Sequence, residues 1–287
     1  MMAALAILVL AVFTAAQPPF SGVGCEPQLF APQLWSAGEE VHGGTFTADG
    51  GRFYFFKKVG PEDFRIVEAR WSGDGWRGPF PVDFSATTSD LYPAVSPDAT
   101  RIVFTSYRRV PGDTSARPNA HLWTVERSGD GWNEPRPLPA ISSLGDYHPG
   151  VKMLYDGTLY FRVISRTARA TYRAAYVGGD YPRRERVTSY DQAQSPTVRV
   201  WGAEPGPDGS RFFLTTAPLA AAPSTFGPAD IHVADADQHG WRAPSRLSSR
   251  INTDANEVAV TATPDGQHLL FTRDGRLYQV RIGVPCA

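Results

Sequence analysis

The chain has 287 residues, with 28 basic and 29 acidic side chains, and its formal net charge is −1. Because acidic and basic residues are interspersed, no basic patch indicates a nucleic-acid partner. The sequence also lacks a P-loop, a dinucleotide-binding fingerprint, a Gly-x-Ser-x-Gly elbow and a Cys/His cluster at metal-binding spacing. We therefore expect no cofactor and no bound metal.

Residues 1–16 are almost entirely apolar and end in the small residues Thr14, Ala15 and Ala16. A stretch of about 14 apolar residues is too short to cross a bilayer and is typical of a secretory signal core. No Lys or Arg precedes this core, which leaves open whether the start codon is correctly assigned. The rest has no transmembrane run, so we predict a signal peptide over residues 1–16, a short segment over 17–27, and a periplasmic or secreted protein. A lipid anchor at Cys25 is the alternative, although residues 22–24 lack the Leu of a lipoprotein signal.

One short sequence motif then recurs about every 50 residues, which is the spacing of propeller blades with loop insertions. A turn, usually Asp-Gly, stands before a run of apolar and aromatic residues. Asp-Gly suits a tight hairpin, because Gly accepts a positive φ and Asp can bond its own backbone. The five copies are Asp49-Gly50, Asp98-Ala99, Asp156-Gly157, Asp208-Gly209 and Asp265-Gly266.

Each repeat continues with a further strand, a Gly-rich turn and a strand that opens with Trp and carries Pro. Trp76, Trp132 and Trp241 mark this last strand in three of the repeats. Pro fits an outermost strand, because the unpaired edge can spare an amide hydrogen. With the strand before the Asp-Gly turn, each repeat supplies four antiparallel strands, which is one propeller blade. We predict an all-β propeller of five blades over residues 28–287, with six blades as the alternative.

The pattern resembles the TolB-type, WD40-like propeller repeat, often called PD40, whose signature is near P-x-x-S-P-D-G-x-x-I-x-F-x-S. The fit is close over residues 92–106 and 251–272, and the resemblance covers residues 28–283. The third repeat departs from it, with Met153-Leu154-Tyr155 in place of Ser-Pro, and the second has Ala99 where Gly is usual. TolB carries an additional N-terminal module for which this chain has no room, so its partner-binding role is not carried over.

The two ends of the repeat region predict how the ring closes. The last repeat ends one strand short of a blade, and residues 28–35 form an apolar segment before the first repeat. Placing this segment beside the last repeat as its outermost strand would remove an exposed edge; a disordered tail is the alternative. Cys25 and Cys286 flank this seam, so we predict a disulfide between them in an oxidising compartment, with two free thiols as the alternative.

Strand alternation places the long connections and the starts of the innermost strands on one face of the ring. The polar residues at these starts are the predicted ligand-binding residues, with His148 and Asp90 the foremost: Glu40, His42, Asp90, Tyr92, Asp146, His148 and Glu257. Long loops over convergent acids and imidazoles are typical of a ligand site. Repeated acids at these positions are also compatible with hydrogen bonds between neighbouring blades, and a lone His is often structural.

Three kinds of function remain open. The first is a non-enzymatic, monomeric propeller that binds a protein or glycan of the cell envelope through this face. The second is a glycoside hydrolase that uses carboxylates such as Glu40, Asp90, Asp146 and Glu257, whose separation would set the stereochemistry. The third is a metal-assisted polysaccharide lyase, which would need His42, His148 and a third ligand. No catalytic residue can be named from the sequence, and we favour the binding module.

Overall fold

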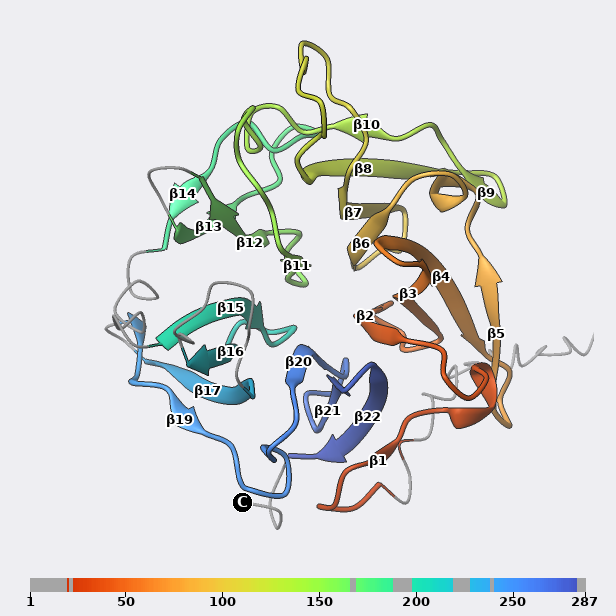
Figure 1. Ribbon diagram of the computed structural model, residues 1–287, viewed down its shortest axis with the longest axis vertical. Helices are drawn as coiled ribbons and strands as arrows, with labels where there is room; N and C mark the ends of the chain where they lie inside the picture. The colour runs from red at the N-terminus through yellow and green to blue at the C-terminus, as the bar shows by residue number, and fades with distance from the viewer. Residues whose placement is uncertain are drawn as a thin grey trace, which may run out of the picture.

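The computed structural model describes residue 20 and residues 23–165, 169–187, 198–218, 228–237 and 240–282, with only the backbone of residues 198–203, 237 and 240. Five antiparallel sheets stand around a central axis, each with its innermost strand toward that axis (Figure 1). This arrangement confirms a β-propeller of five blades. The predicted signal peptide lies outside the described residues.

The first three blades follow one another along the chain. Blade 1 contains β2 (Val41–Phe46), β3 (Arg52–Gly60), β4 (Asp63–Trp71) and β5 (Trp76–Pro81). Blade 2 contains β6 (Asp90–Val95), β7 (Arg101–Ser106) and β8 (His121–Ser128), with β9 (Gly131–Trp132) and β10 (Arg136–Pro137) both paired to β8. Blade 3 contains β11 (Val151–Met153), β12 (Leu159–Ile164), β13 (Arg169–Ala174) and β14 (Glu185–Arg186).

The last two blades complete the ring. Blade 4 contains β15 (Val198–Pro205), β16 (Arg211–Pro218) and β17 (Asp230–Asp237), with β18 (Gly240–Trp241) and β19 (Ser245–Arg246) both paired to β17. Blade 5 contains β20 (Glu257–Ala262), β21 (His268–Arg273), β22 (Arg276–Arg281) and, from the other end of the chain, β1 (Gln28–Leu29). Two short 3-10 helices, η1 (Pro32–Leu34) and η2 (Asp83–Ser85), lie between strands. No helix among the described residues is long and apolar enough to cross a membrane.

Strand β1 closes the ring, as the sequence predicts. Gln28 pairs with Gln279 and Leu29 with Tyr278, so β1 is the outermost strand of blade 5. The predicted strand over residues 28–35 is nevertheless too long, because the strand ends at Leu29 and η1 follows. Ala31 takes a left-handed φ of 41°, and a proline at position 32 has no amide hydrogen with which to continue the ladder.

The residues that follow β1 pack into the seam between blades 5 and 1. Phe30 and Leu34 are buried in an apolar cluster with Phe46 and Phe53 of blade 1 and Leu277 of blade 5. Beyond the strand, the amide of Arg281 donates to the carbonyl of Gly24 over 3.0 Å. This contact holds the neighbour of Cys25 beside the end of β22. Cys286 lies outside the described residues, so the disulfide stays a prediction.

The apolar core is divided among the gaps between neighbouring blades. Phe53 of blade 1 packs in one cluster with Leu270 of blade 5, and Tyr54, the next residue, packs in another with Ile102 of blade 2. Further clusters lie between blades 2 and 3, 3 and 4, and 4 and 5. Because successive side chains of a strand point to opposite faces of its sheet, each blade supplies both of its neighbours.

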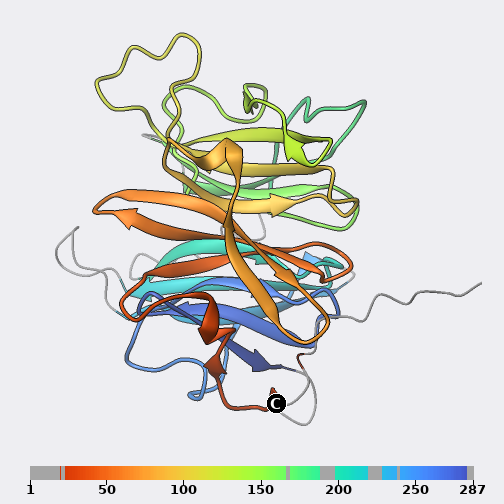
Figure 2. The same ribbon diagram turned by 90° about the vertical axis from the view of Figure 1, so that its right-hand side faces the viewer.

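The two faces of the ring carry different connections. We call the face with the five Asp-Gly-type turns the turn face, and the opposite face, where the innermost strands begin, the loop face. Seen edge-on in Figure 2, the connection between β7 and β8, drawn in yellow, projects from the loop face. The other two long connections expected on this face, over residues 166–169 and 217–229, lie in part outside the described residues, at 166–168 and 219–227.

The innermost strands are irregular near their middle. The register shifts between His42 and Thr45 in β2, and shifts also occur in β6, β15 and β20. Close backbone approach requires glycine in β2, because a Cβ on Gly44 would lie 1.7 Å from the carbonyl oxygen of Tyr54. These bulges re-aim the side chains that follow them, which is their usual effect in a sheet.

Candidate functional site

The seven predicted site residues all lie at the loop-face ends of innermost strands or directly before them, on four of the five blades. Their side chains do not converge on a shared cavity. Three of the acids, Asp90, Asp146 and Glu257, are buried, and each forms an ion pair with a different arginine. We call each such unit an acid–arginine brace.

The brace of blade 2 joins Asp90 to Arg108. Asp90 is completely buried, and Arg108 also donates to the carbonyl of Phe84, in the segment that leads from blade 1 into blade 2. Burial raises the pKa of Asp90, against the opposing effect of the Arg108 guanidinium and of hydrogen bonds. This carboxyl group therefore fixes the entry to β6 and is not presented to solvent.

Blades 3 and 5 repeat the same device. Arg184 donates to Asp146 over 2.6 Å and to the carbonyl of Ile141, which precedes blade 3, over 3.0 Å. Arg273 likewise donates to Glu257 over 2.8 Å and to a carbonyl of the segment that precedes blade 5. In blades 2 and 5, the arginine ties the first residue of the innermost strand to the connection that enters its own blade. In blade 3, the arginine holds together two residues of that connection, Ile141 and Asp146. The geometry therefore agrees with a structural role for these acids.

Glu40 and His42 form the most accessible part of the predicted site. The Glu40 carboxylate is 36% exposed, accepts from Lys58 Nζ over 2.9 Å and lies 3.0 Å from His42 Nε2. Burial opposes ionisation of Glu40, but the hydrogen bonds from Lys58 and His42 outweigh it and lower its pKa. The His42 ring stacks on Phe56 with centroids 5.0 Å apart, and burial lowers its pKa.

His148 is buried and both of its ring nitrogens are engaged. Nδ1 lies 3.1 Å from the carbonyl oxygen of Arg162, so it carries the proton, and Nε2 accepts from the Ser142 hydroxyl over 2.9 Å. Burial lowers the pKa of His148 to about 3, which keeps the ring neutral near pH 7. Tyr92 takes a φ of 51°, and its ring packs against Phe56 with centroids 4.8 Å apart.

The arrangement bears on the enzymatic alternatives. A glycoside hydrolase needs two carboxyl groups that face one substrate, whereas Asp90, Asp146 and Glu257 face separate arginines on separate blades. Within the described ranges, no three His, Cys, Asp or Glu side chains are grouped so that they could hold a metal ion. His42 and His148 therefore have no third ligand there.

Sequence reasoning missed a polar contact at the centre of the ring. Lys152 of blade 3 donates to the carbonyl of Gly44 in blade 1 over 2.7 Å and to Thr261 of blade 5 over 2.9 Å, and its Nζ lies 3.3 Å from Glu204 of blade 4. Burial raises the pKa of Glu204, and Lys152 opposes that effect. We call this contact the axial brace. Its only sequence signal is a charged residue one position before the end of two innermost strands.

The turn-face side of the axial brace is narrow. A cavity of about 50 Å³ lies there, lined by Lys152 and Glu204 together with Pro207 and Pro264 of the turns. The Tyr155 hydroxyl donates to the carbonyl of Pro264 over 3.0 Å, which links blade 3 to blade 5 across this mouth. Such a space suits a few water molecules. Another cavity on this side, of about 210 Å³, lies at the outer end of blade 3.

Two wider hollows open on the loop face. The first measures about 570 Å³ and lies on the face of blade 4 that carries Leu214 and is turned toward blade 3; it is lined by residues of β16, β17 and β19 and, from the connection to blade 5, by Thr253 and Asp254. We call it the blade 4–5 hollow. The blade 5–1 hollow measures about 560 Å³ and is lined by residues 37–40 and by Asp274, Gly275 and Arg276. Both volumes lie within the range of about 300–1,000 Å³ that is usual for ligand sites.

These features define a five-bladed β-propeller with open hollows on its loop face. No protein-family model matches the sequence, and no curated protein matches it. A putative TolB from Agrobacterium tumefaciens has 16% identity and a TM-score of 0.52, over 86% of this chain and 77% of that one. TolB from Acinetobacter baumannii has 14% identity and a TM-score of 0.48, over 85% of this chain but 55% of its own length.

A gluconolactonase from Xanthomonas campestris has 16% identity and a TM-score of 0.46, over 80% of this chain and 69% of that one. At identities this low, likeness between structures shows the fold and carries no activity with it. The chain also spans only about half the length of the Acinetobacter protein.

Proposed function

We propose that the protein is an exported TolB-like propeller that binds a protein or glycan of the cell envelope through its loop face. The observation that carries this proposal is the size of the hollows. Two hollows on the loop face measure about 570 and 560 Å³, whereas two cavities on the turn face measure about 50 and 210 Å³.

The acids of the predicted site favour binding over catalysis. Asp90 has a raised pKa, which is a property of catalytic acids, but its side chain is fully buried and is held by Arg108. Glu40 is accessible, but its pKa is lowered, so it is a poor proton donor near pH 7. Among the seven predicted residues, Glu40 and His42 are those best placed to touch a partner.

Steric shielding of one face at a time tests this proposal. A polyethylene glycol maleimide is attached, without reductant, to Leu144→Cys on the loop face or to Asp130→Cys in the exposed turn between β8 and β9 on the turn face. Each conjugate and the unmodified protein are then assayed for binding to purified envelope glycans and envelope proteins. We expect the loop-face conjugate alone to lose binding. Loss with the turn-face conjugate alone would overturn the choice of face, and no binding to either class by any form would overturn the function.

Export through an oxidising compartment is part of the proposal, and the Cys25–Cys286 disulfide tests it. The seam contact between Gly24 and Arg281 supports the pairing. Mature protein recovered from the periplasm, unfolded but not reduced, should show no free thiol on titration. Two reactive thiols would contradict both the disulfide and the argument for export that rests on it.

A further inference from the structure

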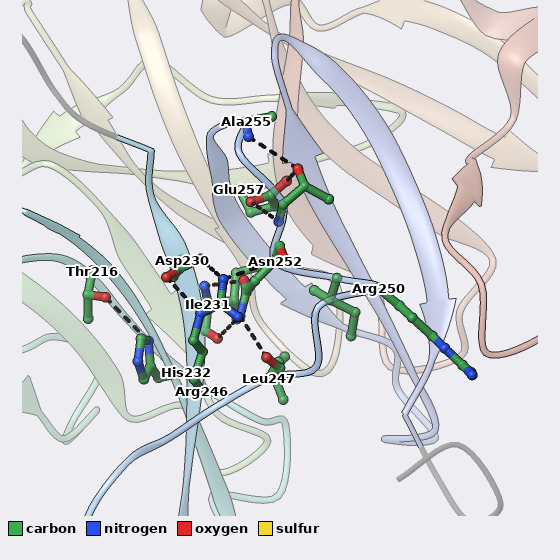
Figure 3. A network of polar contacts seen from close by, with 12 residues as sticks. Thr216, Asp230, Ile231, His232, Arg246, Leu247, Arg250, Asn252, Ala255 and Glu257 are labelled. Carbon is green, nitrogen blue, oxygen red and sulfur yellow. Dashed lines mark hydrogen bonds and ion pairs between the residues drawn. The ribbon is translucent and has the colours of Figure 1, made fainter.

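The blade 4–5 hollow contains a compact set of polar groups that the predicted site did not include. The Asp230 carboxylate accepts two hydrogen bonds of 2.8 Å from Arg246, and Nδ1 of His232 lies 3.3 Å from the Thr216 hydroxyl (Figure 3). Burial lowers the pKa of His232, against the effect of Asp230. The four side chains come from β16, β17 and β19, and all of them line the hollow.

Strand β17, which lines this hollow, is held in place by a buried side chain. The buried side chain of Asn252 accepts from the amide of Ile231 over 2.7 Å and donates to the carbonyls of Ile231 and Leu247 over 2.8 and 3.0 Å (Figure 3). It thereby joins the segment between blades 4 and 5 to the strand that carries Asp230 and His232. A site whose polar groups are fixed before binding loses less entropy when it binds.

The rest of the lining is apolar and rich in proline. Leu214, Ala217, Pro218, Pro228 and Pro244 face the same space. A few fixed polar groups among apolar walls are the usual composition of a small-molecule site. The blade 5–1 hollow is different, because Glu39, Glu40 and Asp274 line it without proline or histidine.

The polar groups indicate the chemistry of the ligand. Asp230 and Arg246 already neutralise each other, so a charged ligand would compete with an ion pair that is formed. Each oxygen of the Asp230 carboxylate accepts one hydrogen bond from Arg246 and keeps capacity for another. A neutral imidazole can accept or donate. Hydroxyl groups, which both donate and accept, match this set, and the proline rings offer apolar contact to the carbon face of a sugar.

We propose that the blade 4–5 hollow binds an uncharged, hydroxyl-rich ligand, namely one or two neutral sugar units of a glycan, through Asp230, His232 and Thr216. This inference rests on the proposed function, since it assigns a ligand class and a place to binding at the loop face. It names residues outside the predicted set, all of them on the blade that contributed no residue to that set.

Isothermal titration of the full mature protein with free neutral mono- and disaccharides tests the site. We expect at least one of them to bind, and Asp230→Asn and His232→Ala each to weaken that binding by about tenfold or more, which corresponds to about 1.4 kcal/mol. His232→Gln keeps a hydrogen-bonding side chain and should restore part of the affinity. Asp74→Asn, in the exposed turn between β4 and β5 on the turn face, is the matched control and should bind as the unchanged protein does. Melting temperatures of all variants establish that each one is folded.

The outcomes separate this inference from the proposed function. If no neutral saccharide binds, or if both substitutions leave binding unchanged in folded protein, the sugar site is wrong. If uronic acids or amino sugars bind more tightly than neutral sugars, the ligand class is wrong. In each case the loop-face shielding experiment can still show binding of an envelope protein or glycan, and the proposed function then stands without this site.

Discussion

At the turn face, all five connections between the first and second strands of a blade use one device, whereas the connections of the loop face differ in length and in contacts. In each turn the Asp carboxylate accepts from the backbone amide two residues further on, over 2.8–3.1 Å. At the loop face, acid–arginine braces secure three blades, and open hollows lie at blade 4 and between blades 5 and 1. The turns are therefore alike because every blade repeats the same hydrogen bond between an Asp and its own backbone. The loop face differs from blade to blade because its side-chain contacts differ.

The largest expected effect comes from breaking a loop-face brace. Replacing Arg108 by Leu leaves the fully buried Asp90 without its counter-charge, which should cost about 3–5 kcal/mol of unfolding free energy. Urea denaturation measures it. The matched control is Arg77→Leu, whose partner Asp74 lies in an exposed turn, and it should leave stability unchanged within error. Equal losses in the two variants would remove the distinction between braces and surface ion pairs.

A smaller effect on the free energy of unfolding is expected from His148, a buried histidine of the same face. The pKa of His148 is lowered to about 3 by burial, whereas its ordinary value is 6.5. Between these values the unfolded chain binds a proton that the folded protein does not, so the stability due to neutral His148 is complete above pH 6.5 and is lost as the pH falls toward 3.

Each pH unit in this interval costs about 1.4 kcal/mol, so acidification from about pH 6.5 to about pH 5 should remove about 2 kcal/mol. Urea denaturation at the two pH values measures the loss, and His148→Gln should reduce it by the same amount. If the pH dependence of the variant equals that of the unchanged protein, His148 is not the group responsible.

The smallest expected effect sharpens the comparison at the turn face. Ala99 stands at a φ of 56° in the turn of blade 2, where the other four turns have glycine. Ala99→Gly should therefore stabilise the protein by about 1 kcal/mol, and Gly266→Ala, which meets no neighbouring atom, should destabilise it by a similar amount. Thermal unfolding of the two variants measures whether each substitution raises or lowers the melting temperature. Two shifts of the same sign would show that backbone conformation does not control these turns.

Much of the fold could be predicted from the sequence, because turns and strand alternation are local properties. The five Asp-Gly-type turns, the four-stranded blades and closure by the N-terminal segment are all present in the structure. The predicted length of the closing strand was wrong. The left-handed backbone at Ala31 and the packing of Phe30 and Leu34 against blade 1 depend on contacts between residues that are distant in sequence.

The site was harder to predict for the same reason. Position in the repeat places three acids, Asp90, Asp146 and Glu257, on the loop face. It does not show that each of them forms an ion pair with an arginine. The axial brace needs residues from four blades, and the blade 4–5 hollow needs an arginine of β19 and a histidine of β17. Neither constellation has a fixed spacing in the sequence.

The pairing of β1 with β22 has a consequence for how the chain reaches this structure. Gln28 and Gln279 are neighbours in the sheet although about 250 residues separate them in sequence. Contacts this remote form late, because the loop they close costs entropy before it brings any gain. Until residues 28–29 arrive, β22 presents an unpaired edge that can recruit a strand of another molecule. The interval before closure is therefore the period in which this edge is most open to pairing with another molecule.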